Sequence, residues 1–590
     1  LNPQKVLHAT FSPDATKVAF VKDNNIYVKD IVNEKTTQIT TDGKTNSIIN
    51  GNCDWVYEEE FGFTRAFQWS KKGNYIAYYR FDESAVPSFT FPVYKDSIYP
   101  ENYTYKYPKV GEQNSTVDIY VYDLNKGTNL KMDIGNEKDI YISRIQFTED
   151  DSKLCITHLN RLQNEQVIFY TDVTNGRNTI LYEETNKAYV DVNKMRVDFL
   201  KDGKSFIYTS EKNGYNHIYL QNINTKKTIQ LTAGNFDVDE IIGVDEKKAI
   251  VYFTAAYRSP LVKDFCSVHL DGKGFALNDL RIGRHTISFN SDFTYYTDSY
   301  SDINTPPFTA IYDSHGKQVR VLADNNKLKQ TLADYALGNT EFIKVVNTIG
   351  DTLNGLMIKP KDFDINKKYP VLFSNYGGPG SQTVYNGWGS TNMWQQMLTQ
   401  KGYIIVSIDN TGTGFRGEAF KKKTYLQLGK YEIEDQIDAA KYIATLPYVD
   451  ANRIGHWGWS FGGFMSCLAI TKGADIFKTA IAVAPVTDWQ YYDDIYTERY
   501  MRTQKENAKG YHDNAPLSFV KNIKGKLLII HGTADDNVHF QNSAMFVDAM
   551  INNNIEFESA YYPNKNHGIR GGNTRLHLYN KMTKFILQNL

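Results

Sequence analysis

The first residues that suggest chemistry are those of GWSFG (458–462), which places Ser460 between two glycines. The apolar stretch 453–457 precedes this motif, and a stretch with helical character, 464–470, follows it. A strand, a sharp turn and a helix in this order form a nucleophile elbow, in which the glycines let the turn project the serine hydroxyl from the sheet. An ordinary glycine-rich turn is the alternative, but this context favours the elbow. We therefore predict that Ser460 is a nucleophile.

An acid and a histidine follow Ser460 in the chain order that α/β-hydrolases use. Asp535 and Asp536 come just after a buried strand, and His567 lies at the end of another. In this interpretation His567 takes the serine proton and later returns it to the leaving amine, while Asp535 orients the imidazole. His531 is a competing base, but it lies on the strand itself and a structural role is favoured for it.

A serine hydrolase also needs two hydrogen-bond donors for the oxyanion of its intermediate. The backbone N–H of Phe461, the residue after the nucleophile, is one expected donor. The other should come from a loop after an earlier strand, and the stretch 374–382 offers the hydroxyl of Tyr376. The alternative is that the Tyr376 ring only packs.

The elements around these residues predict a doubly wound, mostly parallel sheet. Apolar runs that are typical of buried parallel strands occur at 369–377, 402–409, 453–460, 478–486 and 526–532. Helical stretches lie between them, for example 431–446 and 543–554. Alternating strands and helices indicate a sheet covered on both faces. We assign residues 336–590 to an α/β-hydrolase catalytic domain.

The chain before this domain has a different period. Up to about residue 325, alternating strands rich in tyrosine are joined by Asp-Gly, Lys-Gly or Asn-Gly turns. Units of roughly 40–50 residues with four short strands indicate blades of a β-propeller. We count about six blades in residues 1–335, although a set of unrelated hairpins is the alternative. The insertion 82–117 breaks the pattern and is either an arm for a partner or a long loop.

Composition restricts the other classes of function. A net charge of −1 argues against binding nucleic acid through bulk charge. The four cysteines form no CxxC pair, so we expect buried or half-buried free thiols rather than a zinc site or a disulfide scaffold. No apolar run is long enough for a transmembrane helix, and we expect neither a metal nor a cofactor. The chain begins with Leu1, so a preceding segment, with any export signal, is expected to have been removed.

The motifs resemble those of the dipeptidyl peptidase IV branch of the prolyl oligopeptidase family. DWVYEEE, GWSFGG, APVTDWQYYDDIYTERYM, HGTADDNVHFQ and NHGI occur in the order that the family uses, over nearly the whole chain. The resemblance implies a propeller that caps an α/β-hydrolase. It also implies a triad of Ser460, Asp535 and His567, with Tyr376 as an oxyanion donor.

The resemblance further implies how a peptide would bind. Glu59 and Glu60 match a pair that binds the free N-terminal amine, and Asn537 matches a residue that contacts a substrate carbonyl. The implied proline pocket consists of Phe461, Val486, Trp489, Tyr492, Tyr496 and Val538. Such a box of aromatic and valine side chains suits a compact apolar pyrrolidine ring.

The function implied is a serine exopeptidase that releases X-Pro and X-Ala dipeptides from peptide N-termini. A prolyl endopeptidase or an acylaminoacyl peptidase on the same scaffold is the alternative, but the acidic pair at Glu59 and Glu60 argues against it. A non-catalytic propeller protein is disfavoured by the complete triad. The resemblance also implies a homodimer and a periplasmic, cell-surface or secreted location.

Several positions depart from the family pattern. The family propeller has eight blades, so about six suggest a propeller that is incomplete at its N-terminal side. An arginine that helps to orient the peptide lies upstream in relatives and has no counterpart here. Phe461 stands where relatives commonly have tyrosine, and DNTGTG (409–414) lacks the arginine of the related DGRGSG.

The geometry of the glutamate run can be predicted as well. On a strand Glu59 and Glu60 would point to opposite faces, so one amine could not meet both. On a helical turn they lie about 100° apart, given ~3.6 residues per turn, and can converge. We therefore predict a short helical segment here, with mutual repulsion raising the carboxylate pKa values.

Overall fold

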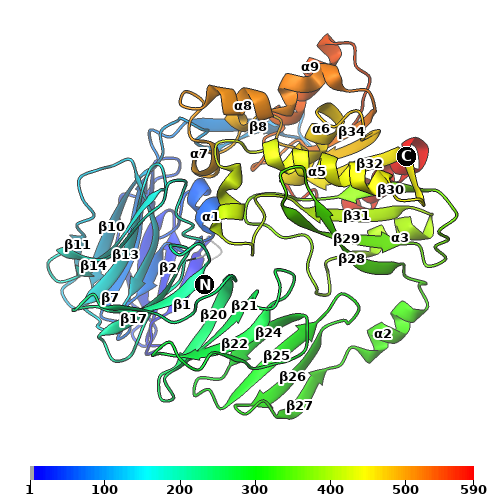
Figure 1. The fold of residues 1–590 in the computed structure, drawn as a ribbon. Coiled ribbons are helices and arrows are strands. Elements are labelled where there is room, and N and C mark those ends of the chain that lie inside the picture. The colour runs from blue at the N-terminus through cyan, green and yellow to red at the C-terminus, as the bar shows by residue number, and fades with distance from the viewer. Residues whose placement is uncertain (1–4, 194) are drawn as a thin grey trace.

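The computed structural model describes residues 5–193 and 195–590, and its N-terminal part consists of six antiparallel sheets (Figure 1). The first two contain β1 (Leu7–Phe11), β2 (Lys17–Lys22), β3 (Asn25–Asp30) and β4 (Thr36–Gln38), then β5 (Ile48–Asn50), β6 (Phe67–Trp69), β7 (Tyr75–Asp82), β10 (Thr116–Asp123) and β11 (Thr128–Lys131). The third and fourth contain β12 (Ile140–Phe147), β13 (Lys153–Asn160), β14 (Glu165–Asp172) and β15 (Asn178–Thr185), then β16 (Val197–Phe199), β17 (Ser205–Ser210), β18 (His217–Asn222) and β19 (Thr228–Gln230). The fifth and sixth contain β20 (Val238–Asp245), β21 (Ile250–Ala255), β22 (Asp264–His269) and β23 (Ala276–Leu277), then β24 (Arg284–Phe289), β25 (Tyr295–Ser301), β26 (Phe308–Asp313) and β27 (Gln318–Ala323).

Successive sheets pack face to face, each pair sharing one apolar cluster. Ala19 and Ile76 belong to the cluster between the first and second sheets, and the same arrangement recurs between every later pair. Central strands such as β17 are therefore buried on both faces, whereas outer strands such as β11 and β27 are exposed along their whole length. About six repeating units were expected from the sequence, and six sheets are observed.

The insertion 82–117 forms a hairpin of β8 (Ser88–Val93) and β9 (Glu101–Lys106) that packs on the C-terminal part of the chain. The Tyr105 hydroxyl donates to the backbone oxygen of Asp536 (2.7 Å), and the Tyr107 hydroxyl donates to that of Asn537 (3.0 Å). The segment is thus anchored within its own chain, on the loop that carries the candidate acid.

The C-terminal part is one eight-stranded sheet with the order β28-β29-β31-β30-β32-β33-β34-β35. Its strands are β28 (Asn339–Val346), β29 (Thr352–Lys359), β30 (Tyr369–Ser374), β31 (Ile404–Asp409), β32 (Val449–Trp459), β33 (Thr479–Val483), β34 (Lys526–Gly532) and β35 (Glu558–Tyr562). The β28–β29 and β29–β31 pairs are antiparallel and all others are parallel, as a mostly parallel sheet requires.

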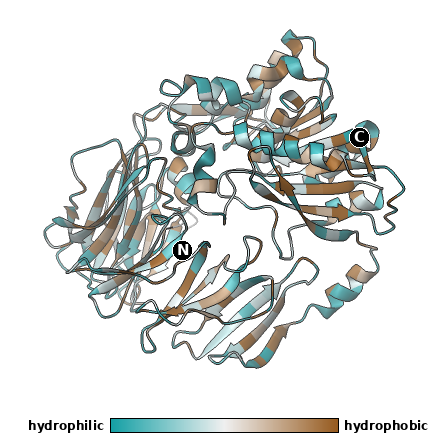
Figure 2. Cartoon of the chain, in the orientation of Figure 1, coloured by the Kyte–Doolittle hydropathy of each residue, from teal (hydrophilic) through white to brown (hydrophobic). Residues whose placement is uncertain are grey.

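Helices cover both faces of this sheet, whose central strands are strongly apolar (Figure 2). The helices are α3 (Met393–Gln400), α4 (Glu418–Lys421), α5 (Lys430–Ala444), α6 (Phe461–Thr471), α7 (Asp494–Met501), α8 (Ala508–Asn514), α9 (Gln541–Asn552) and α10 (Thr574–Asn589). The helices expected at 431–446 and 543–554 correspond to α5 and α9. Helix α2 (Asn326–Ala333) lies between β27 and β28, next to the expected boundary between residues 1–335 and 336–590.

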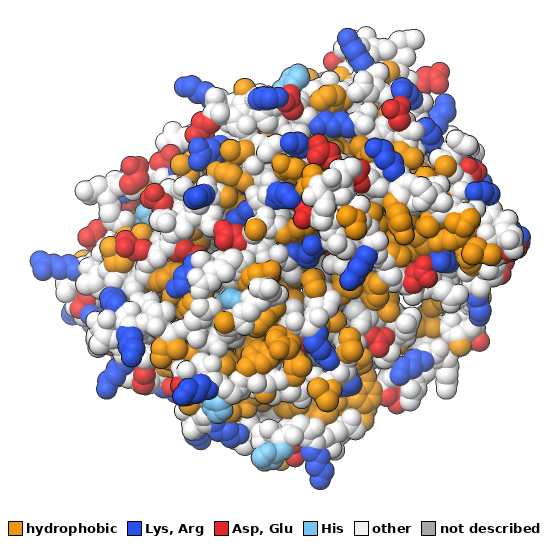
Figure 3. All heavy atoms as spheres, in the orientation of Figure 1, with side chains coloured by type: hydrophobic (Ala, Val, Ile, Leu, Met, Phe, Trp, Pro, Cys, Tyr) orange, Lys and Arg blue, Asp and Glu red, His pale blue; other side chains and the backbone are white. Residues whose placement is uncertain are grey.

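Charged side chains of both signs are interspersed over the face shown in Figure 3, in keeping with the net charge of −1. All four cysteines are buried and free, as expected. Within residues 5–193 and 195–590, no helix has the length and apolar character needed to span a bilayer.

Buried charges join the sheets to helix α7. Arg161, in the turn after β13, donates to Glu498 (2.6 Å) and to Asp494 (3.1 Å). The side chain of Asp494 is fully buried and that of Glu498 is 3% exposed, so the guanidinium compensates two carboxylates that water cannot reach. The contact fixes α7 against the third sheet.

Replacement of Arg161 by Met should therefore destabilise the protein, because it keeps much of the side-chain volume but leaves two buried carboxylates without their cation. Breaking such a group typically costs about 3–5 kcal/mol. The midpoint of thermal unfolding measures this effect. Arg177→Met is the control, since Arg177 is exposed in the same sheet. Equal midpoints for the two variants would contradict the role assigned to Arg161.

Candidate active site

The candidate nucleophile lies on a strained turn between β32 and α6. Ser460 has φ 60° and ψ −118°, and its N–H donates to the backbone oxygen of Val483 (2.9 Å). A Cβ on Gly458 would lie 2.4 Å from the backbone oxygen of Gly462, and one on Gly462 would lie 2.3 Å from that of Asn375. Only glycine fits at both positions, so the motif supplies the sharp turn that the sequence predicted.

Asp535 and His567 are hydrogen-bonded at the same edge of the sheet as Ser460. They follow the parallel neighbours β34 and β35, and Nδ1 of His567 lies 2.8 Å from Oδ2 of Asp535. The other oxygen of Asp535 accepts the N–H groups of Asn537 and Val538, each at 3.0 Å. Burial alone would raise the pKa of Asp535, but the imidazoles of His567 and His531 lower it to about 2. The group is therefore a carboxylate.

The loop of His567 also contacts the serine turn. Nε1–H of Trp459, the residue before Ser460, donates to the backbone oxygen of His567 (3.0 Å). Burial lowers the pKa of His567, but the Asp535 carboxylate outweighs this effect and the pKa is raised above its ordinary value of 6.5. With Nδ1 donating to Asp535, Nε2 is the nitrogen left to accept a proton from a hydroxyl.

His531 has the structural role that the sequence favoured. Its Nδ1 lies 2.6 Å from the hydroxyl of Ser543, and its Nε2 lies 2.8 Å from the backbone oxygen of Val538. Nε2 is also 3.2 Å from the Asp535 carboxylate. Since the side chain is fully buried and both nitrogens are engaged, His531 supports the acid rather than meeting a substrate.

Tyr376 follows β30, the strand next to β32, and its ring centre lies 5.9 Å from that of Phe461. Its surroundings raise the pKa of the hydroxyl to about 12, chiefly by burial, yet 42% of the residue is accessible, so the ring lines an internal space. No described residue hydrogen-bonds to the Tyr376 hydroxyl, which stays protonated at neutral pH and can donate. The N–H of Phe461 is the first of α6, where a helix offers it no acceptor.

The glutamate run is helical, as predicted. Helix α1 (Trp55–Phe61) begins where the Asp54 side chain accepts the N–H of Tyr57 (3.0 Å) and ends at Gly62, whose φ is 68°. Figure 1 shows this helix between the sheets and the C-terminal part. Glu59 is exposed, while Glu60 is 7% exposed.

Burial, more than repulsion, raises the pKa values of the pair. Burial raises the pKa of Glu60 to about 7, with Arg499 opposing this shift and Glu59 adding to it. The pKa of Glu59 is also raised, because the surrounding protein displaces much of the water near its carboxylate although the residue keeps accessible surface. A hydrogen bond from the Asn537 side chain opposes the shift. The direction agrees with the sequence prediction, but the main cause differs from the one expected.

The pair is tied to the triad through Asn537. The amide oxygen of Asn537 accepts the Tyr492 hydroxyl (2.8 Å), and Asn537 lies two positions after Asp535. The two glutamates, which come from the first 61 residues, therefore lie beside a loop near the C-terminus.

The six residues expected to form a proline pocket belong to one apolar assembly. Trp489 is its centre, with ring centres of Phe461, Tyr492 and Tyr496 at 5.7, 5.8 and 5.5 Å. Val486 and Val538 are buried in the same cluster. Trp489 belongs to the short helical turn Trp489–Tyr491, Tyr496 to α7 and Phe461 to α6, while Tyr492 lies between the turn and α7.

Arg499 is a further residue of the candidate site that was not predicted from the sequence. Its Nη1 lies 3.3 Å from Oε2 of Glu60. Nε of Arg499 donates to Gln163 (2.8 Å), so the guanidinium is held on two sides. Arg499 follows Tyr496 by three positions on α7, a spacing that places both on one helix face. This spacing is the signal that could have indicated it.

Two other clusters lie apart from these residues. Asp279, His285 and Asp298 are close enough to share a cation, but Arg281 already bonds both carboxylates.

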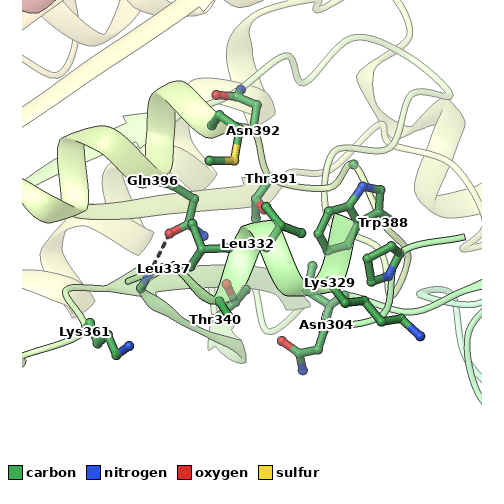
Figure 4. Close-up of a pocket in the computed structure, with 16 residues that line it drawn as sticks. Asn304, Lys329, Leu332, Leu337, Thr340, Lys361, Trp388, Thr391, Asn392 and Gln396 are labelled. Atoms are coloured by element: carbon green, nitrogen blue, oxygen red, sulfur yellow. Dashed lines mark hydrogen bonds between the residues drawn. The ribbon is translucent and has the colours of Figure 1, made fainter. Parts of the chain in front are cut away.

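A pocket of about 400 Å³ lies between α2, α3 and Trp388, and none of the candidate site residues lines it (Figure 4). Inside it the N–H of Gly338 donates to the Gln396 side chain (2.8 Å).

Comparisons with known proteins agree with this geometry. Residues 1–307 match the family described as Dipeptidyl peptidase IV (DPP IV) N-terminal region, and residues 390–590 match the Prolyl oligopeptidase family. The "Probable dipeptidyl peptidase 4" of Aspergillus fumigatus is 34% identical, covering 98% of this chain and 78% of the relative. The "Dipeptidyl peptidase 4" of Trichophyton equinum is 33% identical, with 98% and 77% covered.

A crystal structure of Porphyromonas gingivalis dipeptidyl peptidase 4 is also similar. It superimposes with a TM-score of 0.96 at 42% identity, covering 99% of this chain and 83% of that one. The chain therefore belongs to the dipeptidyl peptidase IV branch of the prolyl oligopeptidase family and is a serine-type dipeptidyl peptidase.

Proposed function

We propose that this peptidase releases X-Pro, and less readily X-Ala, dipeptides from the free N-terminus of peptides. The observation that carries the proposal is the position of Glu59 and Glu60 on α1, linked through Asn537 to the loop of Asp535. In this proposal the two carboxylates bind the peptide ammonium, and the bond after the second residue then reaches Ser460. An endopeptidase would need an open channel here instead.

The chemistry follows from the triad. Ser460 attacks the carbonyl carbon of the second residue while Nε2 of His567 takes its proton. The oxyanion forms beside the Tyr376 hydroxyl and the Phe461 N–H, which stabilise it. His567 then protonates the leaving amine, and water, activated by the same imidazole, hydrolyses the acyl-enzyme. Asp535 stays ionised and stabilises the imidazolium.

The aromatic cluster provides the selectivity for the second residue. A pyrrolidine ring fills the space beside Trp489, Tyr492 and Tyr496, and alanine fills it partly. A flexible, longer side chain would have to displace rings that already pack at 5.5–5.8 Å. Binding through shape therefore discriminates by the second side chain and leaves the first one free to vary.

The proposal includes the architecture. Residues 1–335 form an open propeller of six blades, supported by the stacked sheets, and residues 336–590 form an α/β-hydrolase domain, supported by the strand order. Ile98 and Tyr99, at the tip of the β8–β9 hairpin, are 95% and 81% exposed and suit a homodimer contact. A periplasmic, cell-surface or secreted location completes the proposal.

Replacement of Glu59 or Glu60 by Gln tests the amine anchor. Each change removes a charge that binds the ammonium, so kcat/KM for an X-Pro p-nitroanilide should fall by about 10- to 100-fold, given 1.5–3 kcal/mol for a charged hydrogen bond. N-acetylated substrate is the control, and the wild type should hardly cleave it. Efficient cleavage of the blocked substrate by the wild type would identify an endopeptidase and refute the proposal.

The pH dependence of kcat/KM should be bell-shaped. Below the pKa of His567, which is raised above 6.5, the imidazolium cannot accept the serine proton, so activity rises with pH through that value. The substrate amine, with a pKa of about 7.7–8.0, loses its charge on the alkaline side and binding weakens. A substrate whose amine has a lower pKa should shift only the alkaline limb. A rate that stays constant down to pH 5 would contradict this assignment.

Tyr376→Phe should lower kcat by about 10²–10³-fold, because it removes one oxyanion donor and keeps the ring. KM should change little, since the donor acts mainly in the transition state. Tyr335→Phe, at an exposed position, is the control. A fluorophosphonate probe should label Ser460 in both variants and label nothing in Ser460→Ala. Unchanged kcat in Tyr376→Phe would show that the ring only packs.

A further inference from the structure

A further pocket, of about 470 Å³ and lined mainly by polar residues, lies between the fifth and sixth sheets of the N-terminal part and the C-terminal part. Its lining residues are Asp239, Lys263, Arg284, Thr286, Ser299, Ser301, Pro307, Gln382, Tyr385, Trp388 and Phe415. The first seven come from the fifth and sixth sheets, whereas the last four come from loops after β30 and β31. No step of the proposed mechanism uses this pocket.

The loop that forms one wall is the loop that carries Tyr376. It is fixed to the sheets by several hydrogen bonds, among them Gln382 Nε2 to the oxygen of Pro260 (2.6 Å), Asn386 N–H to that of Leu261 (2.7 Å), and Ile303 N–H to the Asn386 side chain (3.0 Å). Gln382 follows Tyr376 by six positions, which limits their separation to about 20 Å, at ~3.3–3.6 Å per extended residue. The pocket is thus within reach of a short peptide segment bound at the serine.

Arg284 is the cation of this pocket. Its Nη1 donates to the Gln382 side chain (3.3 Å), and its guanidinium lies 4.4 Å from the centre of the Tyr385 ring. Gly387 makes room for it, since a Cβ there would lie 2.6 Å from Cδ of Arg284. Among the described residues, no Asp or Glu lies within the 4 Å of a salt bridge to Arg284. A half-buried guanidinium held against neutral partners can accept an anion without first losing one.

The surroundings add positive charge and hydrogen-bond donors. Lys263 pairs with Asp239, the only acidic residue in the lining. The charge of Arg284 is therefore not neutralised, and the pocket carries one net positive charge. The backbones of Lys263 and Arg284 are bridge partners, which places the two cations on adjacent strands. Ser299 and Ser301 contribute hydroxyl groups. This set of groups fits a carboxylate.

The pocket and the amine anchor adjoin different parts of the rim of the catalytic sheet. The pocket adjoins the loops after β30 and β31. The glutamates act on Asn537, in the loop after β34, and on the Tyr376 hydroxyl, at the start of the loop after β30. Arg284 contacts this second loop six positions further on, at Gln382. A peptide whose ammonium is bound at the glutamates and whose carbonyl lies beside Tyr376 can therefore extend its departing part along this loop toward Arg284.

We propose that this pocket is a subsite for a carboxylate in the departing part of the peptide, with Arg284 as the residue that binds it. The inference rests on the proposed function, because it takes its direction from the amine anchor. The carboxylate is either the peptide C-terminus or an Asp or Glu side chain a few residues after the scissile bond. The enzyme then favours short or acidic peptides over amidated, neutral ones.

The test compares peptides of the form X-Pro-(Gly)n that end in a free acid or an amide, with n from 1 to 6, and a second set with Asp or Asn at each position of an amidated chain. The ratio of kcat/KM for acid over amide should reach about 5- to 10-fold at one length, because a solvent-open ion pair is worth only ~1 kcal/mol or slightly more. The Asp/Asn set distinguishes a side chain from the C-terminus. The ratio should decrease with added salt.

Arg284→Gln should bring the acid-to-amide ratio of kcat/KM close to one. Arg284→Glu should reverse this ratio, so that the amides become the better substrates, and should also favour peptides with Lys at the position where Asp was favoured. Reversal requires a folded, active enzyme, so it cannot arise from misfolding. Arg320→Gln, at an exposed position of the same sheet, is the matched control and should keep the wild-type ratio. A ratio near one in the wild type at every length and position, with X-Pro p-nitroanilide still cleaved, would overturn the subsite and leave the proposed function intact. Failure to cleave the p-nitroanilide would overturn both.

Discussion

The contact between Glu60 and Arg499 is the constraint on which the site depends. Glu60 belongs to α1, which follows β5 in the second sheet of the N-terminal part, whereas Arg499 belongs to α7 in the C-terminal part. Helix α7 is held to the sheets by Arg161 as well, and Gln163 bonds both the Arg499 side chain and the backbone oxygen of Ile495 (2.7 Å). Helix α7 thus helps to fix two parts of the molecule, which carry different halves of the proposed site, relative to each other.

This junction is electrostatically costly, which is informative about its purpose. Taking ions out of water usually costs more than their pairing returns, and apolar residues would stabilise such an interface equally well. The buried pKa shift of Glu60 to about 7 shows that the carboxylate is only partly compensated by Arg499. A substrate ammonium would supply the missing positive charge. The unfavourable electrostatic free energy of the buried Glu60 carboxylate in the free enzyme would then be relieved in the proposed complex.

Local patterns allowed much of this to be predicted from the sequence. The elbow at Ser460 was recognisable because its glycines form a short motif between a strand and a helix, although the close contact that requires Gly462 is with the distant Asn375. The helical glutamate run was predictable because a strand would have separated Glu59 from Glu60. Arg499 was missed because its partner lies more than 400 positions away, and α7 looks like an ordinary aromatic helix. Likewise, the main cause of the Glu60 pKa shift is burial, which depends on how the sheets and α7 pack and not on the neighbouring glutamate alone.

The division of labour between the two parts follows from where each constraint lies. In the proposed function the sheet with Ser460, Asp535 and His567 carries out acyl transfer and the aromatic cluster around Trp489 selects the residue before the cut, but neither limits how far from the N-terminus the cut falls. In the proposed function that limit comes from α1, a helix of seven residues outside the catalytic sheet. The position of α1 is fixed by its Asp54 cap and by the contact of Glu60 with Arg499. A change in these few contacts would therefore shift where the peptide ammonium is bound, and with it the bond that is cleaved, without altering the triad. Selection can therefore act on the site of cleavage and on the catalytic machinery separately.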